Sequence, residues 1–341
     1  MDKFKLPLFV FLVLTFFMTN SAFAANKIIF GVDDREDYYE MPNNLKALAN
    51  STVSLWHTSR LQFEKETNSY RIFTSTFGND YNLCPGVKFR EQQRGASCSG
   101  ALVGENLILT AGHCVQDERR CKNTAFIFDY IVKSPKAGHI TNIPAENVYF
   151  CSKLMTQENQ HTTVTNNGQS VTTHGPDLAI IKLARKVKDR KPIGINRKDN
   201  IKKGAPVFTM GHPKGLPLKL SQNARVVKEV TKELAYFKTN LDGFHGNSGG
   251  AVFNTETLLI EGILVRGDSG DFLQTFDGCY IYKVRPENAG YGADVTKINL
   301  LTDFIPLTPE EQASEEKIET DTANLQKLDF TETLRQTNFD F

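Results

Sequence analysis

The chain has 341 residues, 40% of them hydrophobic, and its 40 Lys and Arg residues nearly balance its 39 Asp and Glu residues. A chain of this length and composition can bury the core of one large or two small domains. The balanced charge argues against a nucleic acid or a polybasic membrane contact as its partner.

The first 24 residues differ in composition from the rest of the chain. Lys3 and Lys5 precede an apolar run at 6–18, and small residues lead up to Ala24. This order is typical of a secretory signal peptide, so we expect cleavage after Ala24 and a secreted or periplasmic protein. The alternative is a membrane anchor. It is disfavoured because the run is shorter than the ~20 apolar residues that span a bilayer.

Short runs rich in β-branched and aromatic residues recur through the rest of the chain, with turn residues between them. No long amphipathic helix separates the runs, which argues for an all-β barrel or sandwich. A first set of expected strands comprises Thr52–Trp56, Tyr70–Thr74, Ser99–Val103, Leu107–Ala111, Ala125–Ile131 and Leu178–Leu183. A second set comprises Pro206–Met210, Ala224–Val230, Leu234–Phe237, Ala251–Phe253, Leu258–Val265 and Cys279–Val284.

Four further segments complete the expected organisation. The lysine-rich stretch 185–203 is the expected linker between the two sets of strands, and the Thr-, Asn- and Gln-rich stretch 156–175 is expected to be a long exposed loop. Residues 307–341 are expected to form an acidic polar tail, which is either disordered or docked back on the body. Apolar residues at helical spacing predict a C-terminal helix: Val295, Ile298, Leu301 and Ile305.

The segment Gly246–Gly250 reads Gly-Asn-Ser-Gly-Gly, so that Ser248 is flanked by glycines. A serine in this setting is a candidate nucleophile, and a serine nucleophile needs a base. In α/β-hydrolases the base histidine follows the serine, but the last histidine of this chain is His245. Any catalytic histidine must therefore lie upstream, which excludes that class of enzyme.

Two upstream motifs supply the partners. His113 lies in the segment Leu109–Cys114 at the end of an expected strand, and Asp177 opens the apolar run Leu178–Leu183. The order His, Asp, Ser is that of chymotrypsin-type proteases. With these motifs the chain resembles bacterial trypsin-like serine proteases over residues 28–306. The resemblance implies a serine endopeptidase that forms an acyl-enzyme, acts on proteins or peptides and needs no cofactor or metal.

The resemblance also implies a fold and a division of the site. It implies two six-stranded antiparallel Greek-key barrels, at about 28–185 and 200–306, closed by the C-terminal helix. The first barrel would supply His113 and Asp177, and the second would supply Ser248. The backbone N–H groups of Gly246 and Ser248 would bind the oxyanion. We expect a monomer that contacts no membrane once the signal peptide is removed.

Six cysteines in an exported chain indicate disulfides. The resemblance implies the bridge Cys98–Cys114, which would staple the loop that carries His113. Cys121 and Cys151 flank two strand-like runs and form a plausible pair, which leaves Cys84 with Cys279, but the sequence does not decide these pairings. No Cys-x-x-Cys occurs, which argues against a zinc site.

The substrate pocket is less defined by the sequence. Asp242 lies six residues before Ser248, where the trypsin-like pattern places the base of the pocket, and a carboxylate there would favour Arg or Lys. His245 should line the cleft. Arg266, on the opposite wall, would neutralise Asp242 or bind an acidic substrate group itself, and Asp242 as a purely structural residue is a further alternative. An apolar or acidic preference therefore stays open.

The chain also departs from trypsin before the serine. Asn247 stands where trypsin has the aspartate that receives a new N-terminal amine, so the trypsin-like site Lys27–Gly31 cannot work through that ion pair. Asn247 and the segment Asp33–Arg35 are closer to glutamyl-endopeptidase-like members, but the stretch 262–267 lacks the histidine that those members use. The remaining alternative function is a catalytically silent binding protein on a protease scaffold.

Overall fold

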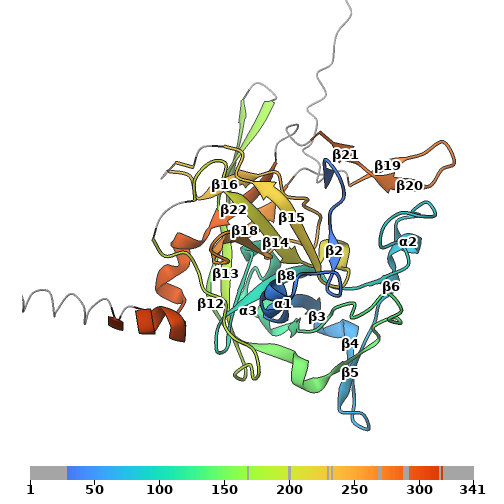
Figure 1. Cartoon of the computed structure of the whole chain (residues 1–341), viewed down its shortest axis with the longest axis horizontal. Helices are drawn as coiled ribbons and strands as arrows, with labels where there is room; N and C mark the ends of the chain where they lie inside the picture. The colour runs from blue at the N-terminus through green and yellow to red at the C-terminus, as the bar shows by residue number, and fades with distance from the viewer. Residues whose placement is uncertain are drawn as a thin grey trace, which may run out of the picture.

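The computed structural model describes residues 29–317 except for 167–168, 199–200, 229, 232, 268–270, 287–291 and 315. The expected signal peptide and most of the expected tail lie outside the described residues. The described chain forms two β-structures, with the strands of the first (blue to green) below those of the second (yellow to orange) in Figure 1. No helix in this part of the chain is long and apolar enough to cross a membrane.

The first β-structure is a closed six-stranded barrel with the strand order β10-β12-β13-β9-β8-β3. Its interior is apolar, and Leu55, Leu102 and Phe126 are among its fully enclosed side chains. The expected barrel is therefore confirmed. Its strands are β3 (Thr52–His57), β8 (Cys98–Gly104), β9 (Leu107–Thr110), β10 (Thr124–Ile127), β12 (Val148–Asn166) and β13 (Gln169–Leu183).

The second β-structure is a seven-stranded sheet with the order β16-β22-β18-β17-β14-β15-β2. An antiparallel bridge between Val226 and Thr239 joins the chain just after β15 to the end of β16, which brings the two sides of a six-stranded barrel together. The expected all-β double barrel is thus confirmed. The strands are β2 (Glu36–Asp37), β14 (Pro206–Gly211), β15 (Lys219–Arg225), β16 (Tyr236–Thr239), β17 (Ala251–Asn254), β18 (Ile260–Arg266) and β22 (Ala293–Lys297).

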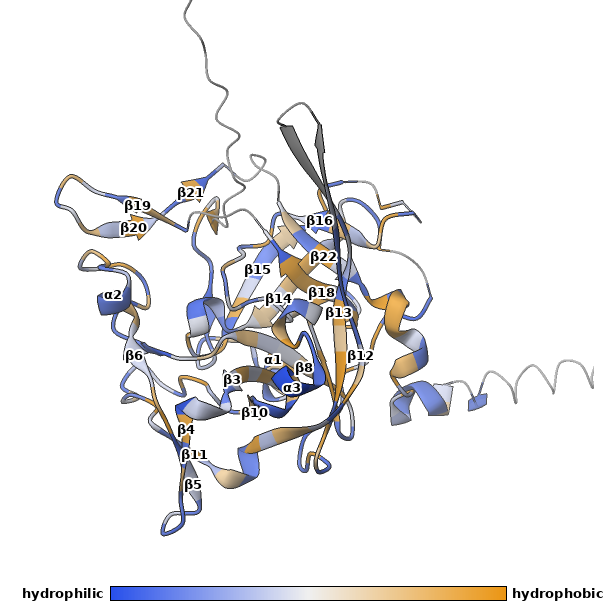
Figure 2. Cartoon of the chain, turned by 180° about the vertical axis from the view of Figure 1, so that it is seen from behind, coloured by the Kyte–Doolittle hydropathy of each residue, from blue (hydrophilic) through white to orange (hydrophobic). Residues whose placement is uncertain are grey.

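One apolar cluster joins the two barrels. Leu109 and Ile180 of the first barrel and Phe208 and Ile263 of the second belong to the same buried group. Figure 2 shows the hydrophobic residues concentrated on barrel strands such as β13 and β18, whereas α2 (Phe77–Asp80), outside the barrels, is mostly hydrophilic. Because interiors of this kind are close-packed, the loops that meet at the junction are held in fixed positions.

The C-terminal helix differs from the expectation. Val295 lies in strand β22, between β16 and β18, and the helix that follows is the 3₁₀ helix η5 (Ile298–Phe304). All five residues of β22 are buried, its polar side chains included, so burial does not alternate along the strand. The expected strand Cys279–Val284 instead contributes to a hairpin outside the barrel, formed by β19 (Phe272–Gln274) and β20 (Tyr280–Tyr282).

The expectation of an exposed loop at 156–175 is wrong. Strands β12 and β13 continue beyond the barrel as an antiparallel hairpin through this stretch, with Thr162 opposite Thr173. Threonine and valine favour extended backbone, and polar residues suit a two-stranded ribbon that water reaches on both faces. The hairpin leads the chain directly to Asp177.

The N-terminal segment was expected with the first barrel, but its strands pair with other partners. Strand β1 (Ile29–Phe30) pairs with β21 (Val284–Arg285), and β2 pairs with β15 of the second sheet. The buried ion pair between Lys219 of β15 and Asp37 of β2 fixes this attachment, with Nζ 2.6 Å from Oδ1.

The remaining elements lie around the first barrel or in the connections. Tyr70, expected in a barrel strand, lies in the separate sheet β11-β5-β4. These elements are α1 (Asn43–Asn50), η1 (Thr58–Arg60), β4 (Leu61–Glu64), β5 (Ser69–Ile72), β6 (Ser75–Thr76), β7 (Gln93–Arg94), η2 (Gly112–Cys114), α3 (Glu118–Lys122), β11 (Asn142–Pro144), η3 (Ala145–Asn147) and η4 (Pro213–Gly215).

Candidate active site

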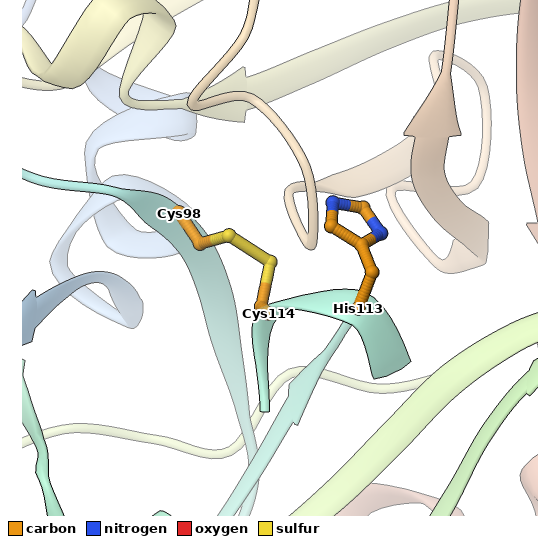
Figure 3. A group of neighbouring side chains, drawn as sticks. All are labelled: Cys98, His113 and Cys114. Atoms are coloured by element: carbon orange, nitrogen blue, oxygen red, sulfur yellow. A yellow bond between two sulfur atoms is a disulfide. The ribbon is translucent and has the colours of Figure 1, made fainter. Parts of the chain in front are cut away.

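His113 lies on the 3₁₀ turn η2, directly after strand β9 of the first barrel. The disulfide Cys98–Cys114, with its Cα atoms 6.2 Å apart, ties strand β8 to this turn, and Figure 3 shows the imidazole ring on the turn that carries the bridge. The sulfurs of the two cysteines are bonded to each other, so this group offers no thiolate to a metal. The disulfide therefore holds the loop that carries His113 in place.

The other two cysteine pairs are also bridged, as Cys84–Cys279 and Cys121–Cys151. The structure thus contains the expected bridge Cys98–Cys114, and it decides the pairings that the sequence left open. Three disulfides in a chain of this size suggest an extracellular or periplasmic compartment.

Asp177 is buried beside His113, where β13 approaches β9. Its Oδ2 lies 2.7 Å from His113 Nδ1, and its Oδ1 accepts a hydrogen bond of 3.0 Å from the backbone N–H of His113. Two bonds to one carboxylate fix both the position and the ring orientation of the histidine. With Nδ1 engaged by the carboxylate, Nε2 is the ring nitrogen left to exchange a proton.

Ser248 lies in the loop between β16 and β17, on the second sheet. Its carbonyl oxygen accepts a 2.8 Å hydrogen bond from Ser99 N and lies 3.7 Å from Cys114 Sγ. The main chain of Ser248 therefore lies next to the Cys98–Cys114 disulfide, which holds the turn that carries His113. No hydrogen bond joins Ser248 Oγ to His113 in this structure, and such bonds are often long until substrate binds.

The turn Phe244–Asn247 presents the N–H groups expected to bind the oxyanion. Asn247 N donates to Phe244 O at 3.0 Å, and Gly246, the third residue of the turn, has a φ of 98°. A side chain is excluded there because a Cβ atom would lie 2.4 Å from His212 O. Neither Gly246 N nor Ser248 N donates a hydrogen bond to any described residue. Both donors are thus available to an oxyanion.

Asp242 is buried and contacts the N-terminal strand. Its Oδ1 accepts a 2.7 Å hydrogen bond from Phe30 N, and its Oδ2 is buried without a partner among the described residues. Burial disfavours the charged carboxylate and raises the pKa of Asp242 to about 7, against the opposing effects of Phe30 and Arg35. The carboxylate therefore titrates near neutral pH.

Arg266 does not make the contact with Asp242 considered from the sequence. Its Nε lies 3.2 Å from Asp294 Oδ2 and its Nη1 lies 3.8 Å from Asp177 Oδ2. Its Nη2 donates to Gly175 O at 3.4 Å. The guanidinium belongs to the last residue of β18, the second strand after Ser248, and its charge is shared between the carboxylates of Asp177 and Asp294.

The remaining predicted pocket residue, His245, has a side chain that is 67% exposed. Its Nδ1 lies 3.6 Å from Asp271 Oδ2, and the same carboxylate forms a buried ion pair with Lys214. Sequence reasoning missed both Lys214 and Asp271. They are 57 residues apart, and no local pattern links them.

Sequence reasoning also missed the role of Arg35. This fully buried side chain lies over the rings of Phe244 and Tyr282, with its Cζ 4.3 and 4.4 Å from the ring centroids. Its Nη2 pairs with Asp33 Oδ2 at 2.6 Å. Phe244 belongs to the turn before Ser248, so the N-terminal segment packs against the back of that turn. The adjacent acidic and basic residues in Asp33–Arg35 were the only signal in the sequence.

The fold and this geometry define a double β-barrel with a His–Asp pair and a glycine-flanked serine at the junction of the barrels. The family model described as a trypsin-like peptidase domain matches residues 98–260, a segment that contains His113, Asp177 and Ser248. Residues 98–260 therefore form a trypsin-like peptidase domain, and the double barrel is that of the chymotrypsin fold. The closeness of the chain to the glutamyl-endopeptidase-like members stays a prediction.

Two solved structures are similar to the chain. One is the VesB protease of Vibrio cholerae, with a TM-score of 0.45 and 15% identity, covering 82% of this chain and 66% of that one. The other is human heparin-binding protein, with a TM-score of 0.44 and 11% identity, covering 80% of this chain and 94% of that one. The match thus spans 66% of the length of VesB. No curated protein matches the chain.

Proposed function

We propose that this protein is a secreted serine endopeptidase in which Ser248, His113 and Asp177 form the catalytic triad. The observation that carries the proposal is the 2.7 Å contact between His113 Nδ1 and the buried Asp177, next to Ser248. This arrangement leaves Nε2 of the histidine for the serine hydroxyl. An alternative, a silent binding protein on the same scaffold, has no specific observation in its favour.

The residues account for each step of the reaction. Nε2 of His113 takes the proton of Ser248 as its Oγ attacks the scissile carbonyl, and it returns the proton to the leaving amine. Asp177 stabilises the imidazolium that forms between these steps. The N–H groups of Gly246 and Ser248 bind the oxyanion, and each such donor contributes roughly 3 kcal/mol in the transition state. A water activated by His113 then hydrolyses the acyl-enzyme.

A fluorophosphonate probe tests this proposal directly, because it reacts with a serine only when the base and the oxyanion donors are in place. We expect the wild-type protein to be labelled and the Ser248→Ala variant to remain unlabelled. Ser221→Ala, which removes a buried hydroxyl from strand β15, is the matched control and should label like the wild type. An unlabelled wild-type protein would favour the silent binding protein, and labelled Ser248→Ala would exclude Ser248 as the nucleophile.

We further propose that the substrate pocket prefers Arg or Lys through Asp242. One observation supports this specificity. Oδ2 of Asp242 is buried without a partner among the described residues, so an incoming cation would satisfy it.

We expect Asp242→Asn to weaken the preference for Arg and Lys while raising stability at alkaline pH. The folded-state pKa of about 7 lies above the ordinary aspartate pKa of 3.8, so the native state binds more protons than the unfolded state between these values. Stability must therefore fall as pH rises through this window, by up to about 4 kcal/mol for a shift of this size. Asparagine keeps an acceptor for Phe30 N and carries no charge, which removes this loss.

Two measurements check this prediction. Urea unfolding at pH 5 and pH 8, in a Ser248→Ala background to prevent self-digestion, should show a flatter pH dependence for the asparagine variant. Cleavage of a peptide library by the active Asp242→Asn protein should show less enrichment of Arg and Lys before the cut. An unchanged cleavage profile would assign Asp242 a purely structural role.

A further inference from the structure

The turn that presents Gly246 N to the oxyanion must be held in place by some contact. Asn247 is neutral, and its Nδ2 makes only a 3.5 Å hydrogen bond to the backbone oxygen of Asp242. A charged residue at this position could have been fixed by an ion pair, but an amide cannot. The contacts that hold the turn must therefore come from elsewhere in the described structure.

The shortest such contact comes from the main chain of Lys214. Its N–H donates a 2.5 Å hydrogen bond to the carbonyl oxygen of His245. The C=O of His245 and the N–H of Gly246 belong to one planar trans peptide, so the two groups point in opposite directions. The bond from Lys214 therefore sets the direction in which Gly246 N–H points. The turn η4 packs so closely that Lys214 N would lie 2.9 Å from a Cβ on Gly246.

The backbone of Lys214 is held in an unfavourable conformation. Its φ of 57° and ψ of 16° lie in the left-handed region, which costs a non-glycine residue roughly 1–2 kcal/mol. A residue stays in such a region only when its surroundings over-determine it. The surroundings here include Arg94, whose Nε donates a 2.6 Å hydrogen bond to Lys214 O. Arg94 is in turn paired with Asp80 at 2.6 Å.

The side chain of Lys214 is fixed by an ion pair and two aromatic rings. Its Nζ is paired with Asp271 Oδ2, and both side chains are more than nine-tenths buried. The same Nζ lies 5.0 Å from the ring centroid of Tyr81 and 5.4 Å from that of Phe272. The ammonium group is thus enclosed by a carboxylate and two π-faces, which suits a buried cation.

Asp271 connects this ion pair back to the oxyanion turn. Its Oδ2 is 3.6 Å from Nδ1 of His245, the residue whose carbonyl Lys214 binds. Burial alone would raise the pKa of Asp271, but the contacts with His245 and Lys214 outweigh burial and lower it. The carboxylate is therefore ionised at neutral pH, as an ion pair with Lys214 requires.

The two segments that surround the Lys214 ammonium group are joined by a disulfide. Asp271 and Phe272 lie at the start of the β19–β20 hairpin, and Tyr81 directly follows α2. The disulfide Cys84–Cys279 links these two segments, which project from the same side of the molecule in Figure 1. The position of Asp271 is thus fixed independently of the oxyanion turn itself.

We propose that Lys214 and Asp271 are a positioning pair that holds the His245–Gly246 peptide with its N–H toward the oxyanion. The pair fixes the turn without an N-terminal amine, which Asn247 could not bind as an ion pair. The inference rests on the proposed serine-protease function, because it assigns the pair a role in that reaction.

The test compares Lys214→Met and Asp271→Asn with a matched buried pair elsewhere. We expect each variant to lower kcat by about 10- to 100-fold, somewhat less than the loss of a whole oxyanion donor. KM should change less than about threefold, because the donor acts mainly in the transition state. The rate of fluorophosphonate labelling should fall with kcat. The double variant should be little worse than either single variant, because the two residues act as a unit.

Lys219→Met is the matched control. Lys219 is also a buried lysine, paired with Asp37 and lying 4.6 Å from the ring centroid of Phe89, but its Nζ bonds to none of the described residues 242–248. Its loss should lower the melting temperature as much as Lys214→Met does, with kcat retained. Lys214→Arg, which keeps the charge, should recover most of the lost kcat.

Three results would overturn the proposal. Equal losses of kcat in Lys214→Met and Lys219→Met would indicate a general effect of stability. An effect confined to KM would place the pair in substrate binding, and unchanged kcat in a folded Asp271→Asn variant would remove the ion pair from the mechanism. If Ser248→Ala retains labelling, the proposed function fails as well. The positioning proposal alone fails when labelling requires Ser248 but is indifferent to Lys214.

Discussion

Replacing Ser248 or His113 by alanine should each reduce peptide turnover by about 10⁶-fold, because the members of a triad act as one unit. Without the hydroxyl no acyl-enzyme forms. Without the imidazole the hydroxyl has no proton acceptor, since Asp177 contacts His113 and not the serine. Release of fluorescent peptides from labelled casein measures the loss. The double variant should be no slower than either single variant.

His57→Ala is the control for this experiment. His57 is an exposed histidine at the end of β3, hydrogen-bonded to Ser59, and it should be replaceable without loss of turnover. A Ser248→Ala sample that retains ordinary turnover would remove Ser248 from the mechanism. A His113→Ala variant with only a modest loss would show that another group acts as the base.

The sequence was sufficient to predict the parts of the site that depend on short motifs. Ser248 and Gly246 were identifiable because a turn that exposes two N–H groups needs glycine at a positive φ, which Gly246 adopts. Asp177 was identifiable because it opens an apolar run that enters the barrel. The order of the motifs along the chain then indicated which barrel supplies each residue.

The sequence could not predict elements whose burial hides their pattern. Strand β22 is buried along its whole length, so Val295 and the apolar residues after it matched a helical spacing equally well. The β12–β13 hairpin was missed for the opposite reason, because its residues 161–163 and 173–174 are consecutive polar residues that are exposed on both faces. The outer part of the hairpin shows no alternation of hydrophobicity with a period of two, the property by which strands are recognised, and β22 alternates only from Ala293 to Thr296.

The sequence also could not predict that the charged residues around the site are buried and paired. Lys214 and Arg35 both read as ordinary surface charges in the sequence, yet each is buried against partners that the fold brings from distant segments. One ring that covers each of them, Phe272 for Lys214 and Tyr282 for Arg35, comes from the β19–β20 hairpin. Only the tertiary structure reveals that such charges are paired.

Asp177→Asn should lower kcat by about 10⁴-fold while leaving the fold intact. The carboxylate accepts from both His113 N and His113 Nδ1, and an asparagine side chain offers only one acceptor oxygen. If that oxygen serves the backbone N–H, the amide NH₂ faces the ring and favours the tautomer with a proton on Nε2. That tautomer cannot accept the proton of Ser248. Turnover of labelled casein, with circular dichroism to confirm folding, measures the effect.

Asp294→Asn is the matched control for the aspartate. Asp294 is a second buried carboxylate that shares Arg266 with Asp177, with its Oδ2 3.2 Å from Arg266 Nε, but it does not contact His113. We expect a loss of kcat below about tenfold, because the charge changes only around Arg266 and Lys238, the two partners of Asp294, and the histidine keeps both bonds. Equal losses in the two variants would show that Arg266, and not the hydrogen bond from His113, determines the effect. A much larger loss in Asp177→Asn would instead identify the carboxylate that orients the catalytic histidine.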